Sequence, residues 1–456
     1  MSNIRKILNN GKKVELPIWN GKTPYALYYN GECVWKNNIP KEYSLLLVFA
    51  GGLDYISIQP IEIAENKGKL LLKQGDTLNL EVIGSFDYDS SQKFYYSPLE
   101  KTKRKTAEIF LSEISQIKDE CFKDNTMITQ FVANSSLQLK KIGNYAFGMS
   151  TTMSVSRLDL VSLPDSVEEF GDYCFRMTTF RTLKFPLNLK KIGVECFYES
   201  ELGGEIVLPS VEVIKPYAFY GCKNIISVKI GSNIQEIGIV RFYGSPFYNC
   251  TNLFKISVED NEYYRTENNV LFNKSCSELI YYATNLSNET YTIPDTVNKI
   301  CSGSFANNTK ITEINIPESV EYIGDNAFGF CYSLQTINLP DSVLTIEDGI
   351  FRNCTSLSYI KLPSSLTKIP TNMCEGCTSL ENIEFPNITV IGGGSFSAAG
   401  LIEIVIPKSV TTIENYAFAN CKNLKTIKYM GTEEEWQNVE KMMYWNQNTN
   451  AEIIFS

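Results

Sequence analysis

The feature that most constrains this fold is a repeat with a nearly constant period. From about residue 293 onward, proline recurs every 23 residues, at Pro294, Pro317, Pro340, Pro363 and Pro386. A second slot keeps the same step with Phe305, Phe328, Phe351 and Cys374, and then continues at a step of 22 with Phe396 and Phe418. A fixed period of roughly 20–29 residues is typical of stacked supersecondary units, so the chain is predicted to form a solenoid.

Each repeat is predicted to contribute a short strand and a bend to this stack. Ile337 and Leu339 are two residues apart, which places them on one face of a strand, and Pro340 ends that strand because it donates no backbone hydrogen bond. Gly324 and its equivalents are predicted to allow a sharp bend, and the segment around Phe328 to form one helical or 3₁₀ turn. A single repeat buries too few apolar side chains to fold alone, so neighbours must share a core and the ends need caps.

The repeated pattern I-P-x-S-V-x-x-I-G-x-x-A-F-x-x-C-x-x-L resembles the BspA-like leucine-rich repeats of bacterial and protist surface proteins. The resemblance covers about residues 108–456, three quarters of the chain, and many copies keep both the period and the residue types. It implies a leucine-rich-repeat solenoid that is mostly β, with short helical or 3₁₀ turns. It also implies adhesion or binding at a surface, although a fold alone does not fix a function.

Changes in this pattern divide the chain into four segments. Residues 1–40 are predicted to be a β-hairpin arm that docks onto a partner. Residues 41–107 are predicted to be a small β-sandwich-like domain, because β-rich runs alternate there with Gly, Asp and Asn. Residues 108–430 are assigned to the solenoid, with a hairpin insert at 258–292 where the period breaks. Residues 431–456 are assigned to a C-terminal cap, which resembles the closing cap of the same family.

The arm carries two hairpin signals, Asn20-Gly21 and Asn30-Gly31. Around the second of them, the stretch Y-Y-N-G-x-x-V-W resembles the openings of tailed-phage structural proteins. That resemblance implies that residues 1–40 attach the protein to a docking partner on a virion.

The insert and the cap carry their own secondary-structure signals. Two strand-like runs, Val270–Phe272 and Leu279–Tyr282, predict a hairpin similar to one that recurs in BspA-like arrays. Four tyrosines of the insert either form a contact patch or pack the hairpin onto the array: Tyr263, Tyr264, Tyr281 and Tyr282. In the cap, a helix capped by Thr432 is predicted from Glu433 to about Lys441, and a last strand over Ala451–Phe455.

Composition argues against several classes of partner. The net charge is −9 and the pI about 5.0, which argues against binding to nucleic acid or to an anionic membrane surface. No run of about 18 apolar residues is present, so membrane insertion is not expected. The N-terminal residues lack the apolar segment of a signal peptide, so none is expected.

The 13 cysteines mostly occupy slots of the repeat. Six of them follow the phenylalanine slot by three residues: Cys222, Cys250, Cys331, Cys354, Cys377 and Cys421. We expect buried free thiols, and therefore folding in a reducing cytoplasm. The one C-x-x-C motif, Cys374 to Cys377, has the spacing of redox and zinc sites, but both residues fill ordinary repeat slots, so the motif is interpreted as structural.

The sequence lacks several residues and motifs on which common enzyme mechanisms depend. The absence of histidine excludes Ser-His-Asp triads, Cys-His dyads and histidine-liganded metals. Neither G-x-x-x-x-G-K-[ST] nor G-x-G-x-x-G is present. We therefore expect a protein that is not an enzyme and that holds no cofactor and no metal.

The outward positions of the predicted strands form the candidate binding face. They lie between the core positions and line up in columns, which a solenoid presents as an extended surface. The candidates are Glu313, Thr336, Tyr359 and Asn382 in one column and Asn338, Lys361 and Glu384 in the next, and the columns extend to Asn315, Glu403, Val405, Thr426 and Lys428. They show no single sign of charge and no dense aromatic stripe, so an ordinary solvated face is the alternative and no ligand class follows.

These observations predict a non-enzymatic, surface-displayed protein that binds a protein or glycan ligand on a cell surface. The free thiols and the missing signal peptide favour a phage virion component, which folds in the host cytoplasm and leaves by lysis. The alternative is a bacterial or protist cell-surface adhesin exported by an unrecognised route. The predicted location is accordingly a virion or a cell surface.

Overall fold

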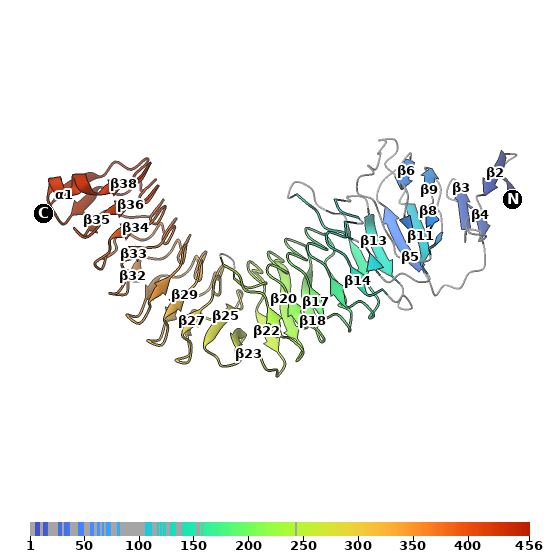
Figure 1. Ribbon diagram of the computed structural model, residues 1–456, viewed down its shortest axis with the longest axis horizontal. Helices are drawn as coiled ribbons and strands as arrows, with labels where there is room; N and C mark the ends of the chain where they lie inside the picture. The colour runs from blue at the N-terminus through green and yellow to red at the C-terminus, as the bar shows by residue number, and fades with distance from the viewer. Residues whose placement is uncertain are drawn as a thin grey trace. The chain divides into compact units, whose positions relative to one another are not determined.

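The computed structural model describes most of the chain from residue 139 onward. The described ranges there are 139–151, 156, 158–241 and 244–456. Before them, it describes residues 116–117, 119–120, 122–124 and 128–133, and the backbone of strands β1 to β11. The chain forms two compact units, one of residues 1–204 and 210–212 and one of residues 205–209 and 213–456. β-Strands dominate the described part of both units (Figure 1).

The first unit begins with antiparallel strand pairs. They are β1 (Arg5–Asn9) with β2 (Lys12–Leu16), β3 (Ala26–Tyr29) with β4 (Glu32–Lys36), β6 (Tyr55–Ile58) with β9 (Leu70–Lys73), and β7 (Glu62–Ile63) with β8 (Asn66–Lys67). A five-stranded sheet follows, in the order β10 (Leu80–Val82), β11 (Lys105–Leu111), β5 (Ser44–Phe49), β13 (Ile128–Ala133) and β15 (Leu160–Ser162). The hairpin signals Asn20-Gly21 and Asn30-Gly31 lie outside the described residues, and the predicted segment boundaries stay predictions.

The repeats of the first unit stack through two-residue parallel strands. These strands are β12 (Gln116–Ile117), β14 (Lys141–Ile142), β16 (Glu169–Phe170) and β17 (Lys191–Ile192). The second residue of each strand is buried. Inside the unit, the ring of Phe175 stacks between those of Phe147 and Phe197, with both centroid distances at 5.5 Å. The repeats therefore share one apolar interior, as their period predicts.

The second unit carries two kinds of parallel ladder. The longer strands form three sheets: β18 (Gly203–Leu208), β20 (Asn224–Ile230) and β22 (Lys255–Val258); β26 (Thr290–Thr292), β28 (Glu313–Asn315), β30 (Thr336–Asn338) and β32 (Tyr359–Lys361); and β35 (Glu403–Ile406), β37 (Thr426–Tyr429) and β39 (Glu452–Phe455). The shorter strands are β19 (Val213–Ile214) and β21 (Glu236–Ile237); β27 (Lys299–Ile300), β29 (Tyr322–Ile323) and β31 (Thr345–Ile346); and β33 (Lys368–Ile369), β34 (Val390–Ile391), β36 (Thr412–Ile413) and β38 (Glu440–Lys441). This stack of parallel strands confirms the predicted solenoid.

A third backbone ladder runs through turns. The N–H of Phe328 donates to the C=O of Ile350 in the next repeat at 3.0 Å, and Asn326 and Phe330 donate to that repeat in the same way at 2.9 and 2.7 Å. Asn326 and Phe330 have φ angles of 49° and 61°, in the left-handed region, so alternate N–H groups point toward the neighbouring repeat. The prediction of a helical or 3₁₀ turn here is wrong, because these donors serve the next repeat and not a helix of their own.

Gly324 is needed for close packing between repeats. A Cβ added there would lie 2.5 Å from the backbone nitrogen of Ser302 in the preceding repeat. Gly392 meets the preceding repeat similarly, with 2.4 Å between its added Cβ and the C=O oxygen of Ile369. Gly324 opens a turn, since the N–H of Ala327 donates to its C=O at 3.2 Å, but its φ is outside the left-handed region, so the turn itself does not require glycine. Glycine is required at these two positions because the backbones of neighbouring repeats approach so closely that a side chain would not fit between them.

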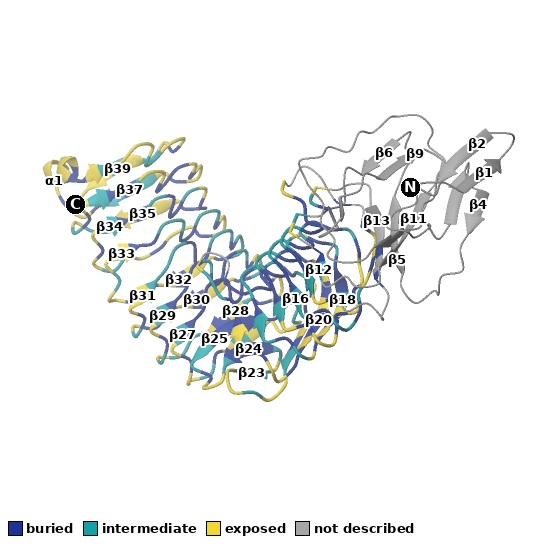
Figure 2. Ribbon diagram, turned by 45° about the vertical axis from the view of Figure 1, so that its right-hand side comes forward, coloured by how far each residue is buried: buried dark blue, intermediate teal, exposed yellow. Residues whose placement is uncertain are grey.

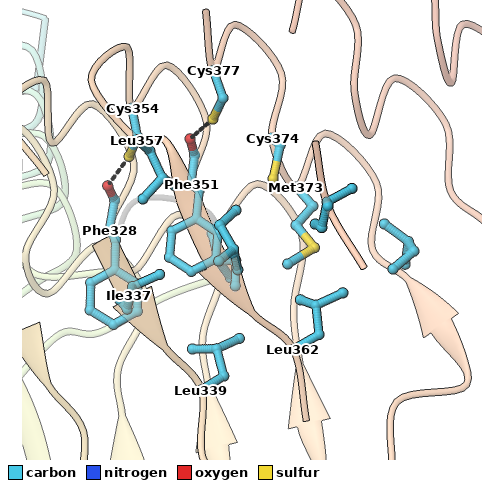
Figure 3. Packing of buried hydrophobic residues seen from close by; sticks show 14 of the residues in the cluster. Phe328, Ile337, Leu339, Phe351, Cys354, Leu357, Leu362, Met373, Cys374 and Cys377 are labelled. Carbon is cyan, nitrogen blue, oxygen red and sulfur yellow. Dashed lines mark hydrogen bonds between the residues drawn. The ribbon is translucent and has the colours of Figure 1, made fainter. Parts of the chain in front are cut away.

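The thiol of the cysteine slot donates a hydrogen bond to a backbone C=O of the preceding repeat (Figure 3). The Sγ of Cys354 donates to the C=O of Phe328 at 3.1 Å, and the Sγ of Cys377 donates to the C=O of Phe351 at the same distance. Cysteine therefore satisfies a buried carbonyl as well as filling a small apolar space. All eleven cysteines within the described residues are buried and free, as expected.

The insert forms an antiparallel ribbon with one strand more than predicted. Its strands are β23 (Tyr264–Glu267), β24 (Val270–Asn273) and β25 (Glu278–Tyr282). Tyr281 and Tyr282 are buried, and the ring of Tyr282 stacks 5.0 Å from that of Phe305, so it fills the phenylalanine slot. The Tyr264 hydroxyl accepts a backbone hydrogen bond, which leaves Tyr263 alone exposed among the four tyrosines. The contact-patch interpretation is wrong, and the packing interpretation is correct.

The C-terminal cap contains the one α-helix of the described residues, α1 (Glu433–Asn438). Thr432 and Glu435 form a capping box, with backbone-to-side-chain hydrogen bonds of 2.8 and 3.2 Å. The helix ends before the predicted Lys441, because residues 440–441 join the stack as β38. Trp436 is buried beside Tyr429, which covers the apolar end of the stack.

Candidate binding face

The outward side chains of β28, β30 and β32 form the face that the sequence predicts. Each strand buries its middle residue and exposes the two residues beside it (Figure 2). The inward residues are Ile314, Ile337 and Ile360, all at most 4% exposed. We call the six outward residues the central face: Glu313, Asn315, Thr336, Asn338, Tyr359 and Lys361.

The register of the parallel strands places these side chains in two columns. Glu313 pairs with Thr336, and Thr336 with Tyr359, which gives the first column. Asn338 pairs with Lys361 in the second column. Neighbouring strands in a sheet lie about 4.8 Å apart, so each column presents one side chain at that interval.

Strand β26 extends both columns by one more residue, which the sequence reasoning missed. Thr290 pairs with Glu313 and Thr292 with Asn315. The Nδ2 of Asn315 also donates to the Oγ1 of Thr292 at 3.3 Å. The motif T-Y-T-I-P aligns with E-I-N-I-P of the next repeat and was the available signal, but the insert just before it breaks the period.

The remaining predicted residues do not continue the same columns. Asn382 and Glu384 are exposed but belong to no strand, and β32 is the last strand of its sheet. Glu403 and Val405 are exposed on β35, in a separate sheet. Their partners Thr426 and Lys428 on β37 are half-buried, which reduces the surface that they offer.

Most side chains of the central face make no hydrogen bond or ion pair with the rest of the described residues. Within the described residues, no hydrogen bond involves the side chains of Thr336, Asn338 or Tyr359, and neither Glu313 nor Lys361 forms an ion pair. Tyr359 is 53% exposed. Glu313 and Lys361 lie at opposite corners of the face, two strands apart. The face therefore offers free hydrogen-bonding groups with opposite charges kept at its edges.

Other polar clusters are occupied by internal ion pairs. In the second unit, the guanidinium of Arg241 lies 3.2 Å from the carboxylate of Asp325, which is buried. It lies 2.9 Å from the carboxylate of Glu347, which is partly exposed. In the first unit, Glu168 lies between Lys140 and Lys190, at 2.7 and 3.1 Å. These groups satisfy one another and stabilise the stack, so they are poor candidates for binding a ligand.

The cysteine pair at 374 and 377 has the properties of core residues. Both side chains are fully buried, and burial raises the pKa of the Cys374 thiol well above its ordinary value. A raised pKa disfavours the thiolate that metal binding and redox exchange require. In the part of the chain that the structure describes, no cluster of three or more acidic, cysteine or histidine side chains could hold a metal ion, and no helix could cross a bilayer.

Comparison with known proteins agrees with this architecture. The family model for the BspA type leucine-rich repeat region, in six copies, matches residues 88–159, 148–274, 244–344, 274–402 and 389–455. Curated protein sequences gave no significant match.

Two solved structures are similar over most of their length. A leucine-rich repeat protein from Eubacterium ventriosum has a TM-score of 0.58 at 22% identity, over 89% of this chain and 95% of its own. The pneumococcal vaccine antigen PcpA has a TM-score of 0.60 at 21% identity, over 88% of this chain and 99% of its own. At these identities the likeness extends to the fold alone.

Proposed function

The chain belongs to the BspA-type leucine-rich repeat family, and from that premise we propose that it is a non-enzymatic binding protein displayed at a surface. It attaches through the central face to a protein or glycan on a cell. The observation that carries this proposal is that Thr336, Asn338 and Tyr359 on β30 and β32 are exposed and make no side-chain hydrogen bond within the described residues. A rigid sheet that holds such groups in register offers a ligand a preformed surface.

The family supports a binding role over a catalytic one. Leucine-rich-repeat families are generally binding scaffolds, and BspA-type members are typically found at the cell surface. We therefore place the protein at a cell surface. The alternative, a phage virion component docked through residues 1–40, rests on the short likeness near residues 28–35 and gains no support from the family match or the similar structures.

Binding to intact cells tests this function. The fluorescently labelled full chain is incubated with a panel of bacterial and epithelial cells, and bound label is measured by flow cytometry. The test variant is Thr336→Arg, which places a long cation in the middle of the central face. The matched control is Thr345→Arg, the same change at an exposed position of β31 in another sheet.

We expect saturable binding to at least one cell type, lost in Thr336→Arg and kept in Thr345→Arg. Binding that both variants keep would move the function to another surface. Absence of saturable binding across the panel would contradict the proposed role.

A further inference from the structure

Building on the binding function proposed above, we propose that the central face takes a neutral glycan chain, which lies along the two columns with one sugar unit against each strand. The columns run from β26 to β32 and include Thr290 and Thr292 as their first members. Four properties of this surface select that ligand over a protein or a charged polymer: its charge, its hydrogen-bonding groups, its single exposed ring and its spacing.

Most of the face carries no charge. Thr292, Asn315, Thr336 and Asn338 occupy two columns of three adjacent strands, and all four side chains are neutral. On this four-strand surface, Glu313 lies between Thr290 and Thr336 in the first column and Lys361 ends the second column, so one charge of each sign is present and neither dominates. A polyanion or polycation would meet both a repelling and an attracting group, whereas a neutral chain loses nothing on either side.

The neutral side chains match the chemistry of sugar hydroxyls. Each amide has both donors and an acceptor, and each threonine hydroxyl can donate and accept. Sugar hydroxyls likewise donate and accept, so each can pair with either kind of group. Asn338 and Thr336 make no side-chain hydrogen bond within the described residues, so both keep their full capacity for a ligand.

The aromatic content of the face fits a sugar ring better than a protein hot spot. Tyr359 presents a ring that is 53% exposed, next to Thr336 in the same column. An exposed ring can stack on the apolar C–H face of a pyranose and keep its hydroxyl in water. Protein interfaces are enriched in aromatic residues, methionine and arginine, and among the six residues of the central face Tyr359 is the one residue of these kinds.

The spacing of the columns suits an extended chain. Side chains recur at about 4.8 Å along each column, close to the length of one pyranose unit in an extended polysaccharide. The four strands β26, β28, β30 and β32 therefore offer contacts to roughly four consecutive units. Each contact is weak alone, but contacts on one chain add, so affinity should rise with chain length until the sheet ends.

Titration with oligosaccharides of defined length tests this inference. The full chain is titrated by calorimetry with cello-, malto-, xylo- and manno-oligosaccharides of two to six units, and with oligogalacturonates as the charged counterpart. We expect one neutral series to bind at least tenfold more tightly as the tetrasaccharide than as the disaccharide, with no further gain at six units. Oligogalacturonates of equal length should bind at least tenfold more weakly.

Variants locate the binding on the face. Tyr359→Ala should weaken binding of the tetrasaccharide at least tenfold. Lys361→Gln should change it less than twofold, because the charge is at the edge. The matched control is Tyr416→Ala, which removes an exposed tyrosine far along the chain and should have no effect. Equal loss in Tyr359→Ala and Tyr416→Ala, or tighter binding of oligogalacturonates, would overturn the inference.

Treated cells separate this inference from the broader function. Cells that bind the chain are oxidised with periodate, which cleaves vicinal diols of glycans, or digested with protease. Loss of binding after periodate and its survival after protease support the glycan. If no oligosaccharide binds, and protease but not periodate abolishes Thr336-dependent cell binding, the ligand is a protein: the glycan inference then fails and the proposed function stands. If neither cells nor oligosaccharides bind, both fail.

Discussion

In β28, β30 and β32 the inward residue is isoleucine each time, whereas the outward residue in the first column changes from Glu313 to Thr336 to Tyr359. The inward residues pack against the preceding and following repeats, so each repeat constrains its neighbours to the same shape. The outward residues are exposed to solvent, and Thr336, Asn338 and Tyr359 make no side-chain hydrogen bond within the described residues. The comparison teaches that packing holds the inward residues to one type, whereas the outward residues can differ from repeat to repeat.

The largest effect should come from emptying the phenylalanine slot. Phe328 is fully buried between Phe305 and Phe351, with ring centroids 5.4 and 5.6 Å away. Phe328→Ala should lower the free energy of unfolding by about 3–5 kcal/mol, because the rigid neighbours cannot close the cavity. Urea unfolding measures this, with Tyr359→Ala on the central face as the control, which should stay within about 0.5 kcal/mol. Equal losses of unfolding free energy in the two variants would contradict the view that the interior stabilises the fold and the central face does not.

A smaller effect should come from separating two neighbouring backbones. Gly392→Ala puts a Cβ 2.4 Å from the C=O oxygen of Ile369, and we expect a loss of about 1–3 kcal/mol in the free energy of unfolding. Gly393→Ala is the matched control one residue later, where the nearest atom is 3.3 Å away. In thermal and urea unfolding, Gly392→Ala should be clearly less stable than Gly393→Ala. If Gly393→Ala were the less stable variant, the close approach of the backbones at Gly392 would not be what limits stability.

A smaller and pH-dependent effect should come from Glu414. Burial opposes its ionisation, but hydrogen bonds from the Nζ of Lys368 and the N–H of Gly393, both at 2.8 Å, leave its pKa below the ordinary value of 4.5. Because the folded pKa is the lower one, its contribution to stability is present above pH 4.5 and is lost as pH falls through the folded value.

The corresponding variant is Glu414→Gln, which should lose roughly 1 kcal/mol of unfolding free energy at neutral pH. Urea unfolding across a pH series should show this difference from the unmodified protein shrinking as the solution becomes acidic. A difference that grows toward low pH has the wrong sign and would contradict the assignment.

The smallest effect on stability should come from the central face itself. Thr336→Arg changes an exposed side chain with no hydrogen bond within the described residues, so its unfolding free energy should stay within about 0.5 kcal/mol of the unmodified value. Thr345→Arg should behave the same way in urea. A loss above 1–2 kcal/mol in Thr336→Arg alone would mean that this face also serves folding.

The sequence predicted the inward slots well because the period encodes them directly. Ile337, Leu339 and Phe328 are buried where the spacing placed them, since one side chain in each repeat must fill the shared interior. The sequence did not show where a residue serves a neighbouring repeat. Gly324 avoids a backbone clash, and Asn326 turns its N–H toward the neighbouring repeat, and neither demand is visible within one repeat.

The central face could be predicted only in part. Its six residues are exposed as the alternation required, but the sequence could not show that β32 ends its sheet before Asn382, or that Thr426 is half-buried. The members on β26 were missed because the insert interrupts the period before Thr290. Which outward positions form one surface depends on where each sheet begins and ends, and that is set by backbone pairing and not by residue type.

Two libraries of the full chain test the separation of folding from binding most directly. One randomises the outward residues Thr336, Asn338 and Tyr359, the other the inward residues Ile314, Ile337 and Ile360, and each is sorted once for soluble folded protein and once for cell binding. We predict that most outward variants fold but lose binding, whereas most inward variants fail to fold. Outward variants that keep binding, or that fail to fold as often as inward ones, would contradict the account.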